Sequence, residues 1–396
     1  MEKIAYFANT DFSLFNFRQE LMREMKGNGF EVFAVASVTN KEIVEEIEKE
    51  GIKFINIPLK RGLDFLGGDF VYFLKVFSLC KREKFFLCHN FTIKPCIFAT
   101  LAQKLAGVKN IYCTITGLGY VFTEAKLSSL LKKIVVWLYK FSFKFVNKVI
   151  FLNPDDREVF LEERIIKKEK TLLILSEGVN TKEFSTERVN KEVQDKLKRE
   201  IDYKEGKIII TLIARLLWQK GIGEFVKAAE ELKRKYSNSE FLLVGPIDKE
   251  NPSGISEKTI KEWENKKIVR YLGERKEVKE ILALSNIVVL PSYYKEGIPK
   301  ILLEAGAMEK PLIATDVSGC KEVVRNNENG FLIEPKNSQQ LAERIEILIK
   351  NKDLREKFGK KSREIVEKEF NVEKIVKEII ESYNIKKSKC QIRTNF

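Results

Sequence analysis

A regular alternation of strand-like and helix-like segments runs through the chain and starts afresh near its middle. Apolar stretches such as Lys3–Ala8 and Lys207–Ala214 are each followed by a segment with helical periodicity, and we expect six strands in each half. Such alternation predicts parallel sheets covered by helices, because neighbouring parallel strands must be joined by a crossover. The 396 residues also exceed one ordinary core, so two α/β domains are expected.

Both expected domains are doubly wound and Rossmann-like, and together they face a central cleft. A charged stretch without strand pattern separates them, and a long amphipathic helix is expected over 354–383. The predicted parts are an N-terminal domain, a linker, a C-terminal domain, a helix that is a candidate to pack back on the first domain, and an unstructured tail: 1–180, 181–206, 207–365, 366–384 and 385–396.

The composition excludes several classes of protein. No run of about 18 apolar residues occurs, so we expect no membrane span, and the N-terminus lacks the pattern of a secretory signal. The six cysteines form no C-x-x-C pair, which argues against a zinc site or a disulfide framework. A reducing cytoplasmic location is therefore expected.

Basic charge is concentrated in the first half of the chain. The net charge is +14, and residues 51–150 contain 16 Lys or Arg but only 4 Asp or Glu. Basic charge with aromatic residues suits an anionic membrane surface, and basic charge alone would suit nucleic acid. The segment Lys126–Lys148 interleaves six lysines with large apolar residues. It is either a helix in the lipid headgroup layer or a core helix with a solvated basic rim.

A pair of glutamates flanks a predicted helix start in the second half. Glu296 precedes Pro299, which favours the first position of a helix, and free backbone N–H groups gather there. Glu304 is the only charged residue within the apolar run Ile301–Met308. A carboxylate in such a run needs a specific partner. The hydroxyl groups of a sugar or ribose would supply one, and a neighbouring basic side chain is the structural alternative.

Two cations follow the first predicted strand of the second half. Arg215 and Lys220 lie in a loop that ends at Gly221 and opens a helix. Fixed cations at such a position can hold a diphosphate and stabilise the charge that a departing nucleoside diphosphate gains.

These residues resemble the retaining glycosyltransferases of family 4. The E-x7-E spacing of Glu296 and Glu304 and the upstream cation loop carry the likeness, together with the stretches Glu177–Asn180, Val269–Gly273, Gly319–Val324 and Asn329–Leu332. The resemblance covers the second domain and implies the two-domain GT-B fold. It implies that Arg215 and Lys220 hold the donor diphosphate, Glu304 the ribose and Glu296 the transferred sugar, with further donor contacts from Gly297, Ile298 and Lys300.

The first half is similar to a narrower group within that family. The stretches His89–Pro95 and Thr114–Phe122 resemble capsule, O-antigen and N-glycan enzymes, among them the N-acetylgalactosaminyltransferases that extend lipid-linked bacillosamine. The likeness implies a polyprenyl-diphosphate-linked acceptor. His89, the only histidine, is predicted to be catalytic alongside Glu296, and the predicted acceptor contacts are Ser13, Asn16, Arg18, Lys94 and Thr116.

The predicted reaction is transfer of a sugar, most simply an N-acetylhexosamine from a UDP-sugar, to a lipid-linked saccharide at the inner face of the cell membrane. No D-x-D triplet occurs, so we expect no metal and no cofactor. The alternatives are a nucleotide-sugar epimerase or phosphorylase on the same fold, and a basic nucleic-acid-binding protein; the main prediction includes no nucleic-acid partner.

Overall fold

The computed structural model describes residues 1–60, 67–118, 129–249, 251–293 and 297–385. The chain divides into two compact units, which are Met1–Gly178 with Val372–Phe396, and Val179–Asn371. The C-terminal helix α15 (Val372–Ser382) belongs to the first unit, where it contacts α1 (Asp11–Gly27).

The first unit contains a parallel sheet of seven strands in the order β3-β2-β1-β4-β5-β6-β7. The strands are β1 (Lys3–Thr10), β2 (Glu31–Ser37), β3 (Lys53–Asn56), β4 (Leu87–Phe91), β5 (Asn110–Ile115), β6 (Lys148–Phe151) and β7 (Thr171–Leu173). Six of them match the predicted strands. The seventh, β7, was not predicted, because three half-buried residues at a sheet edge give too short a pattern.

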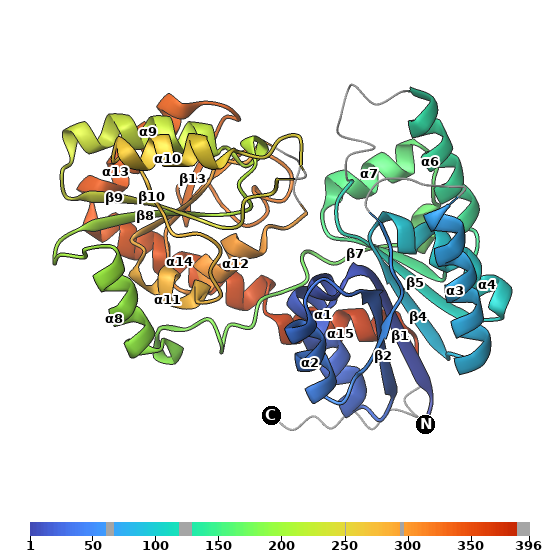
Figure 1. The fold of residues 1–396 in the computed structure, drawn as a ribbon. Helices are drawn as coiled ribbons and strands as arrows, with labels where there is room; N and C mark the ends of the chain where they lie inside the picture. The colour runs from blue at the N-terminus through green and yellow to red at the C-terminus, as the bar shows by residue number, and fades with distance from the viewer. Residues whose placement is uncertain (61–66, 119–128, 250, 294–296, 386–396) are drawn as a thin grey trace. The chain divides into compact units, whose positions relative to one another are not determined.

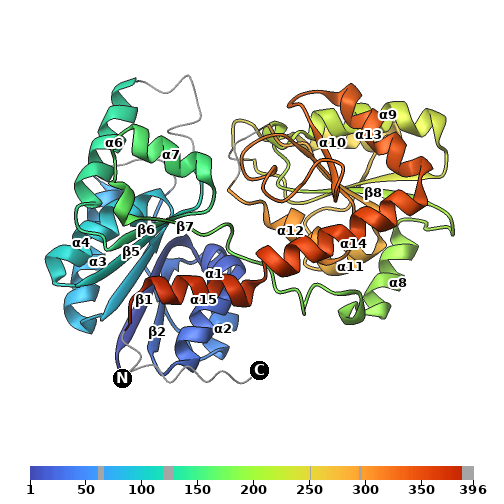
Figure 2. The same cartoon turned by 180° about the vertical axis from the view of Figure 1, so that it is seen from behind.

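Helices cover both faces of this sheet (Figures 1 and 2). Successive residues of β1 enter different cores: Ala5 and Phe7 face one, and Ile4 and Tyr6 the other. A strand buried on both faces therefore reads as a continuous apolar run. One core is completed by α1, α2 (Lys41–Lys49) and α15, and the other by α3 (Gly68–Glu83), η1 (Pro95–Ala99), α4 (Thr100–Ala106), α6 (Ser129–Ser142) and α7 (Pro154–Glu162).

The second unit contains a parallel sheet of six strands in the order β10-β9-β8-β11-β12-β13, and all six predicted strands are confirmed. The strands are β8 (Ile208–Ile213), β9 (Ser239–Val244), β10 (Arg270–Tyr271), β11 (Ile287–Leu290), β12 (Leu312–Thr315) and β13 (Gly330–Ile333). The helices are α8 (Lys191–Glu200), α9 (Ile222–Lys235), α10 (Glu257–Asn265), α11 (Val278–Leu284), α12 (Lys300–Ala307), α13 (Ser338–Lys350) and α14 (Lys352–Glu369).

Three segments differ from the predictions. The stretch 181–206 is no bare linker, because α8 packs Leu197 against Ile209 and Leu242 of the second unit's sheet. The helix predicted over 354–383 is two helices, α14 and α15, and the carbonyl of Phe370 at the break accepts the N–H of Val179. Residues 318–325, predicted as a helix, form turns over 318–323 and no regular structure after them, and Gly319 is left-handed with φ 89°.

Each sheet reverses its strand order at one point, between β1 and β4 in the first unit and between β8 and β11 in the second. At such a switch point the connections leave in opposite directions, and a crevice opens beyond the carboxyl ends of the two strands. The doubly wound α/β architecture predicted for both halves is confirmed, and its chemistry is expected at these two edges.

Candidate functional site

In the second unit, the loop after β8 crosses the carboxyl end of β11. Gly221 has φ 73°, and a Cβ there would lie 2.0 Å from the carbonyl oxygen of Pro291, so the close approach requires glycine. The carbonyl of Gln219 accepts the backbone N–H of Tyr293 at 3.0 Å and the hydroxyl of Ser292 at 3.2 Å. The loops from the two central strands therefore meet at the switch point.

This loop carries both predicted cations. The Arg215 side chain is 53% exposed, and its Nη1 lies 3.2 Å from Oδ2 of Asp248, in the loop after β9. Because the guanidinium is half exposed, this pair contributes little stability, and a ligand anion can take the place of Asp248 at small cost. Lys220 is half-buried in the turn that leads into α9.

Glu304 lies inside α12, which begins beyond the carboxyl end of β11 with Pro299 as its N-cap. Its side chain is 12% exposed, and its Oε1 lies 3.7 Å from Nζ of Lys300, one helical turn earlier. Burial raises the pKa of Glu304 to about 6, against the opposing effect of the Lys300 charge. The structural alternative, a basic neighbour, is therefore present as Lys300. The pKa of Glu304 is still strongly raised, which is typical of a residue at a functional site.

Of the other predicted donor contacts, Gly297 and Ile298 are half-buried just before the start of α12. Their position beside a helix N-terminus suits an anionic ligand, because the first N–H groups of a helix lack intrahelical acceptors. Glu296 lies outside the described residues.

Two residues at the same edge were not predicted. Ser318, after β12, is buried, and its hydroxyl has no hydrogen-bond partner among the residues that the structure describes. Lys336, after β13, places its Nζ 4.7 Å from the ring centroid of Tyr293. Neither stands in a motif that sequence analysis singled out. Both residues follow the ends of predicted strands, and this position could have indicated them as candidate site residues.

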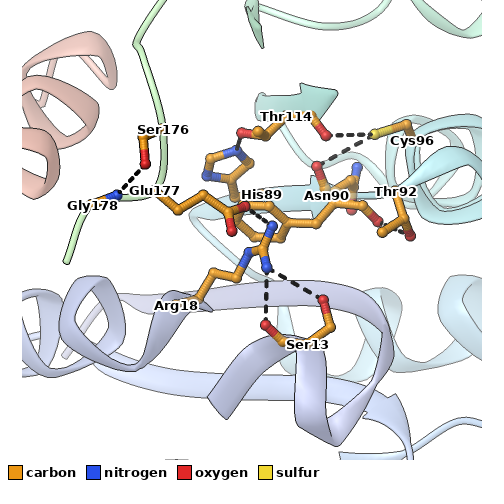
Figure 3. A network of polar contacts seen from close by, with 11 residues as sticks. Ser13, Arg18, His89, Asn90, Thr92, Cys96, Thr114, Ser176, Glu177 and Gly178 are labelled. Atoms are coloured by element: carbon orange, nitrogen blue, oxygen red, sulfur yellow. Dashed lines mark hydrogen bonds and ion pairs between the residues drawn. The ribbon is translucent and has the colours of Figure 1, made fainter. Parts of the chain in front are cut away.

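In the first unit, the predicted acceptor residue Arg18 is 3% exposed and sits at the centre of a polar network (Figure 3). Its guanidinium forms an ion pair with Glu177 and donates to the carbonyl of Ser13 at 3.0 Å and to its hydroxyl at 3.3 Å. Its Cζ lies 4.4 Å from the ring centroid of Phe91. Its Nε is buried and has no hydrogen-bond partner among the described residues. Arg18 therefore positions the start of α1 through its two terminal nitrogens, and its contact with the acceptor stays a prediction.

His89, which was predicted to be catalytic, lies inside the first unit. The side chain is fully buried, and Nδ1 lies 2.7 Å from the Tyr383 hydroxyl while Nε2 lies 2.8 Å from that of Thr114. Burial, with a smaller effect of the Arg18 charge, holds its pKa well below the usual value. His89 is thus a neutral core residue that joins β4 and β5 to the segment after α15.

Lys94, a predicted acceptor contact, has partners within the first unit. It is buried, and its Nζ pairs with Asp69 at 2.5 Å and donates to the carbonyl of Lys60 at 2.9 Å. Asp69 lies in the first turn of α3 and is itself buried, so it requires this counter-ion. Ser13, Asn16 and Thr116 are half-buried, the first two in α1 and Thr116 directly after β5.

Within the residues that the structure describes, no group of three or more His, Cys, Asp or Glu side chains is placed to hold a metal ion. No helix within them has the length and apolarity needed to cross a bilayer.

Solved structures establish the class of fold. The crystal structure of HepE from Anabaena with UDP and glucose has a TM-score of 0.80 at 19% identity, covering 97% of this chain and all of that one. Glycosyltransferases with two doubly wound units of this kind define the GT-B class, and this chain has that fold.

Sequence comparison gives the family. The model for glycosyl transferases group 1 matches residues 193–365, and a glycosyl transferase 4-like model matches residues 3–153. The N,N'-diacetylbacillosaminyl-diphospho-undecaprenol alpha-1,3-N-acetylgalactosaminyltransferase of Campylobacter jejuni is 32% identical over 90% of this chain and 92% of its own length. The UDP-Gal:alpha-D-GlcNAc-diphosphoundecaprenol alpha-1,3-galactosyltransferase of Escherichia coli is 28% identical over 67% of each chain.

The chain belongs to the group 1, family 4-like glycosyltransferases and is an enzyme that transfers a sugar. We set aside the nucleic-acid-binding alternative, because both matching family models describe glycosyltransferases.

Proposed function

We propose that this enzyme transfers an N-acetylhexosamine from a UDP-sugar to a saccharide linked to a polyprenyl diphosphate, with retention of the anomeric configuration. The observation that carries the donor half is the switch point of the second unit, where a cation loop lies against β11 and a buried carboxylate follows on α12. The names of the two bacterial relatives, both of which act on diphospho-undecaprenol acceptors, support the acceptor half.

In this proposal the donor lies beyond β8 and β11. Arg215, which would exchange Asp248 for a phosphate oxygen, and Lys220 hold the diphosphate. Glu304 accepts hydrogen bonds from the ribose, and Lys300 beside it keeps that carboxylate ionised. Gly297 and Ile298 offer backbone N–H groups at the start of α12, and Glu296 contacts the transferred sugar.

The chemistry follows from the leaving group. An acceptor hydroxyl oxygen bonds to the anomeric carbon while the bond from that carbon to the phosphate oxygen breaks, and the electron pair leaves with UDP. The hydroxyl proton passes to the departing phosphate oxygen on the same face, so no separate general base is required. Arg215 and Lys220 stabilise the charge that develops there, which is the task a metal performs in other transferases. We propose that no metal or other cofactor takes part.

The acceptor is proposed to lie at the carboxyl edge of the first unit's sheet. Ser13, Asn16 and Thr116 supply polar contacts, and Arg18 keeps the start of α1 in place behind them. An acceptor carried by a lipid places the enzyme at a membrane surface, and we propose the inner face of the cell membrane, where nucleotide sugars are supplied. The described cysteines are all buried free thiols, in keeping with a reducing compartment.

A thermal-shift screen over UDP-sugars and UDP, run on the wild type and on Glu304→Ala, tests the donor site. We expect one UDP-N-acetylhexosamine to raise the melting temperature of the wild type and to leave the variant unshifted. Product analysis with a synthetic diphospholipid acceptor then gives donor and linkage. Equal shifts in both proteins would contradict the proposed donor site.

A further inference from the structure

Helix α6 of the first unit carries two apolar faces. One face packs into the core beneath it through Val135, Val136, Tyr139 and Phe143. The other face is open to solvent and consists of Leu130, Ile134, Trp137 and Phe141, which we call the α6 stripe. Their spacing of i, i+4, i+7 and i+11 places them along one side of the helix. A core helix with a solvated basic rim, the structural alternative for this segment, accounts for the buried face. It does not account for the exposed apolar face.

The α6 stripe is more exposed than a folded protein in water favours. Leu130 is 66% exposed and Trp137 61%. The rings of Trp137 and Phe141 lie parallel, 5.8 Å apart and inclined by 6°, and Phe145 meets Phe141 edge to face at 5.6 Å. The aromatic groups thus form one ordered apolar surface. Such surfaces mark a site where another apolar phase or molecule is bound.

The charges around the α6 stripe indicate what kind of partner binds it. Residues 129–150 contain no Asp or Glu, and Lys133, Lys140 and Lys144 lie on or beside the exposed face. Nζ of Lys144 lies 5.8 Å from the ring centroid of Phe141. Long lysine side chains beside a large apolar surface can reach phosphate groups while the apolar residues enter the acyl boundary. This combination fits anionic phospholipid.

The position of the stripe agrees with such a role. Helices that connect parallel strands begin at the carboxyl edge of the sheet, so Leu130 and Ile134 lie toward that edge. The first two turns of α3, in the same layer of helices, expose Phe70, Val71 and Leu74 at the same end. Helix α1, whose first turn holds Ser13, starts at that edge too, directly after β1.

We propose that α6 lies in the headgroup layer of an anionic phospholipid bilayer, with the α6 stripe inserted and Lys133, Lys140 and Lys144 bound to lipid phosphates. This inference rests on the proposed function only for the identity of the acceptor. The docked surface would bring the first unit to the layer where a diphospholipid acceptor presents its saccharide. Binding to lipid itself needs neither donor nor acceptor.

Trp137 allows this contact to be observed directly. The full-length chain with Trp218→Phe and Trp263→Phe retains Trp137 as its only tryptophan. We expect its emission to shift to the blue on vesicles containing half phosphatidylglycerol, with quenching by brominated acyl chains and reversal in high salt. Emission that stays unchanged on these vesicles would overturn the proposal.

Flotation of the full-length protein with the same vesicles tests the residues. Replacing the four stripe residues with serine should reduce the bound fraction about tenfold, and circular dichroism checks that the variant is folded. Lys133, Lys140 and Lys144 changed to Gln should also weaken binding, whereas the charge-matched change of Lys352, Lys357 and Lys360 on exposed positions of α14 should not. Unchanged flotation of the stripe variant, or equal losses in both lysine variants, would contradict the proposal.

Activity separates this proposal from the proposed function. The stripe variant should transfer sugar to a short-chain, water-soluble acceptor as fast as the wild type, and about tenfold more slowly to an acceptor embedded in vesicles. Vesicle binding without any sugar transfer would contradict the proposed function and still support the lipid-binding role of the α6 stripe. A wild-type dimer that the stripe variant converts to monomers, with no vesicle binding by either, would assign the stripe to a second copy of the chain instead.

Discussion

The charged residues at the carboxyl edges of the two sheets are used in opposite ways. In the first unit Arg18, Lys94 and His89 are buried, and each is bonded to other parts of the same unit, although Nε of Arg18 has no partner among the described residues. In the second unit the Arg215 side chain is 53% exposed, and among the described residues it pairs with Asp248, whose side chain is 11% exposed. The position of a cation at the end of a strand is therefore not enough to make it a ligand-binding residue. The cation must also be able to exchange its partner within the protein for the ligand.

The largest expected effect contrasts Arg18 with Arg215. Arg18→Ala removes the Arg18–Glu177 ion pair from a nearly closed environment, and we expect the free energy of unfolding to fall by about 3–5 kcal/mol. Arg215→Ala removes a cation that is half exposed, and it should cost less than about 1 kcal/mol. Urea denaturation of the two variants gives both values. Similar losses would remove the distinction between the two edges.

A second prediction concerns the charge of Glu304. Its pKa of about 6 means that the carboxylate is ionised above that pH and protonated below it. If the ionised form binds the ribose, the dissociation constant for UDP should rise about tenfold between pH 8 and pH 5, because a tenfold loss of the ionised form accompanies each pH unit below the pKa. Calorimetry on the wild type and on Glu304→Gln measures this, and the variant should lack the additional pH dependence. An identical pH profile in both proteins would exclude this role.

A smaller effect is expected from His89, which is buried and neutral. Its pKa is lowered in the folded chain, so the unfolded chain binds a proton more readily once the pH falls below about 6.5. The stabilising contribution is complete above that pH and declines below it. Between pH 7.5 and 5.5 the wild type should lose roughly 1 kcal/mol more unfolding free energy than His89→Gln. Denaturation curves at both pH values decide this, and parallel losses would place the His89 ring in contact with solvent.

The smallest effect is expected from chelation. Because two cations and a helix start are proposed to hold the donor diphosphate, excess EDTA should leave the rate of sugar transfer unchanged. A metal-dependent transferase assayed beside it shows that the chelator is effective. Loss of activity with rescue by Mn²⁺ or Mg²⁺ would contradict this prediction.

The fold was largely predictable from the sequence, because strand and helix periodicity are local patterns. All six strands of the second sheet and six of the first were found from apolar runs, whereas the three-residue β7 was too short to show one. The break between α14 and α15 was also missed. It depends on Phe370 meeting Val179, a residue far away in the chain, and the amphipathic pattern itself continues across it.

The site residues, too, were predictable where the signal is local and were not predictable where it depends on distant contacts. Arg215, Lys220 and Glu304 lie in short motifs that follow single strand ends. The structure places the two cations in the loop after β8 and Glu304 in α12, which follows β11. The partners that bury Arg18 and His89 are Glu177 and Tyr383, at sequence separations of 159 and 294 residues. No local pattern reports such contacts, which is why both side chains were predicted to face a ligand.

Binding of UDP in excess EDTA tests the central claim, that the edge of the second sheet holds the donor diphosphate through its own cations. Calorimetry should show the wild type binding UDP, with the dissociation constant about a hundredfold higher when Arg215 and Lys220 are both alanine. His89→Gln, in the first unit, should bind as the wild type does. Unchanged affinity in the double variant, or no binding by the wild type until a divalent metal is added, would contradict the account.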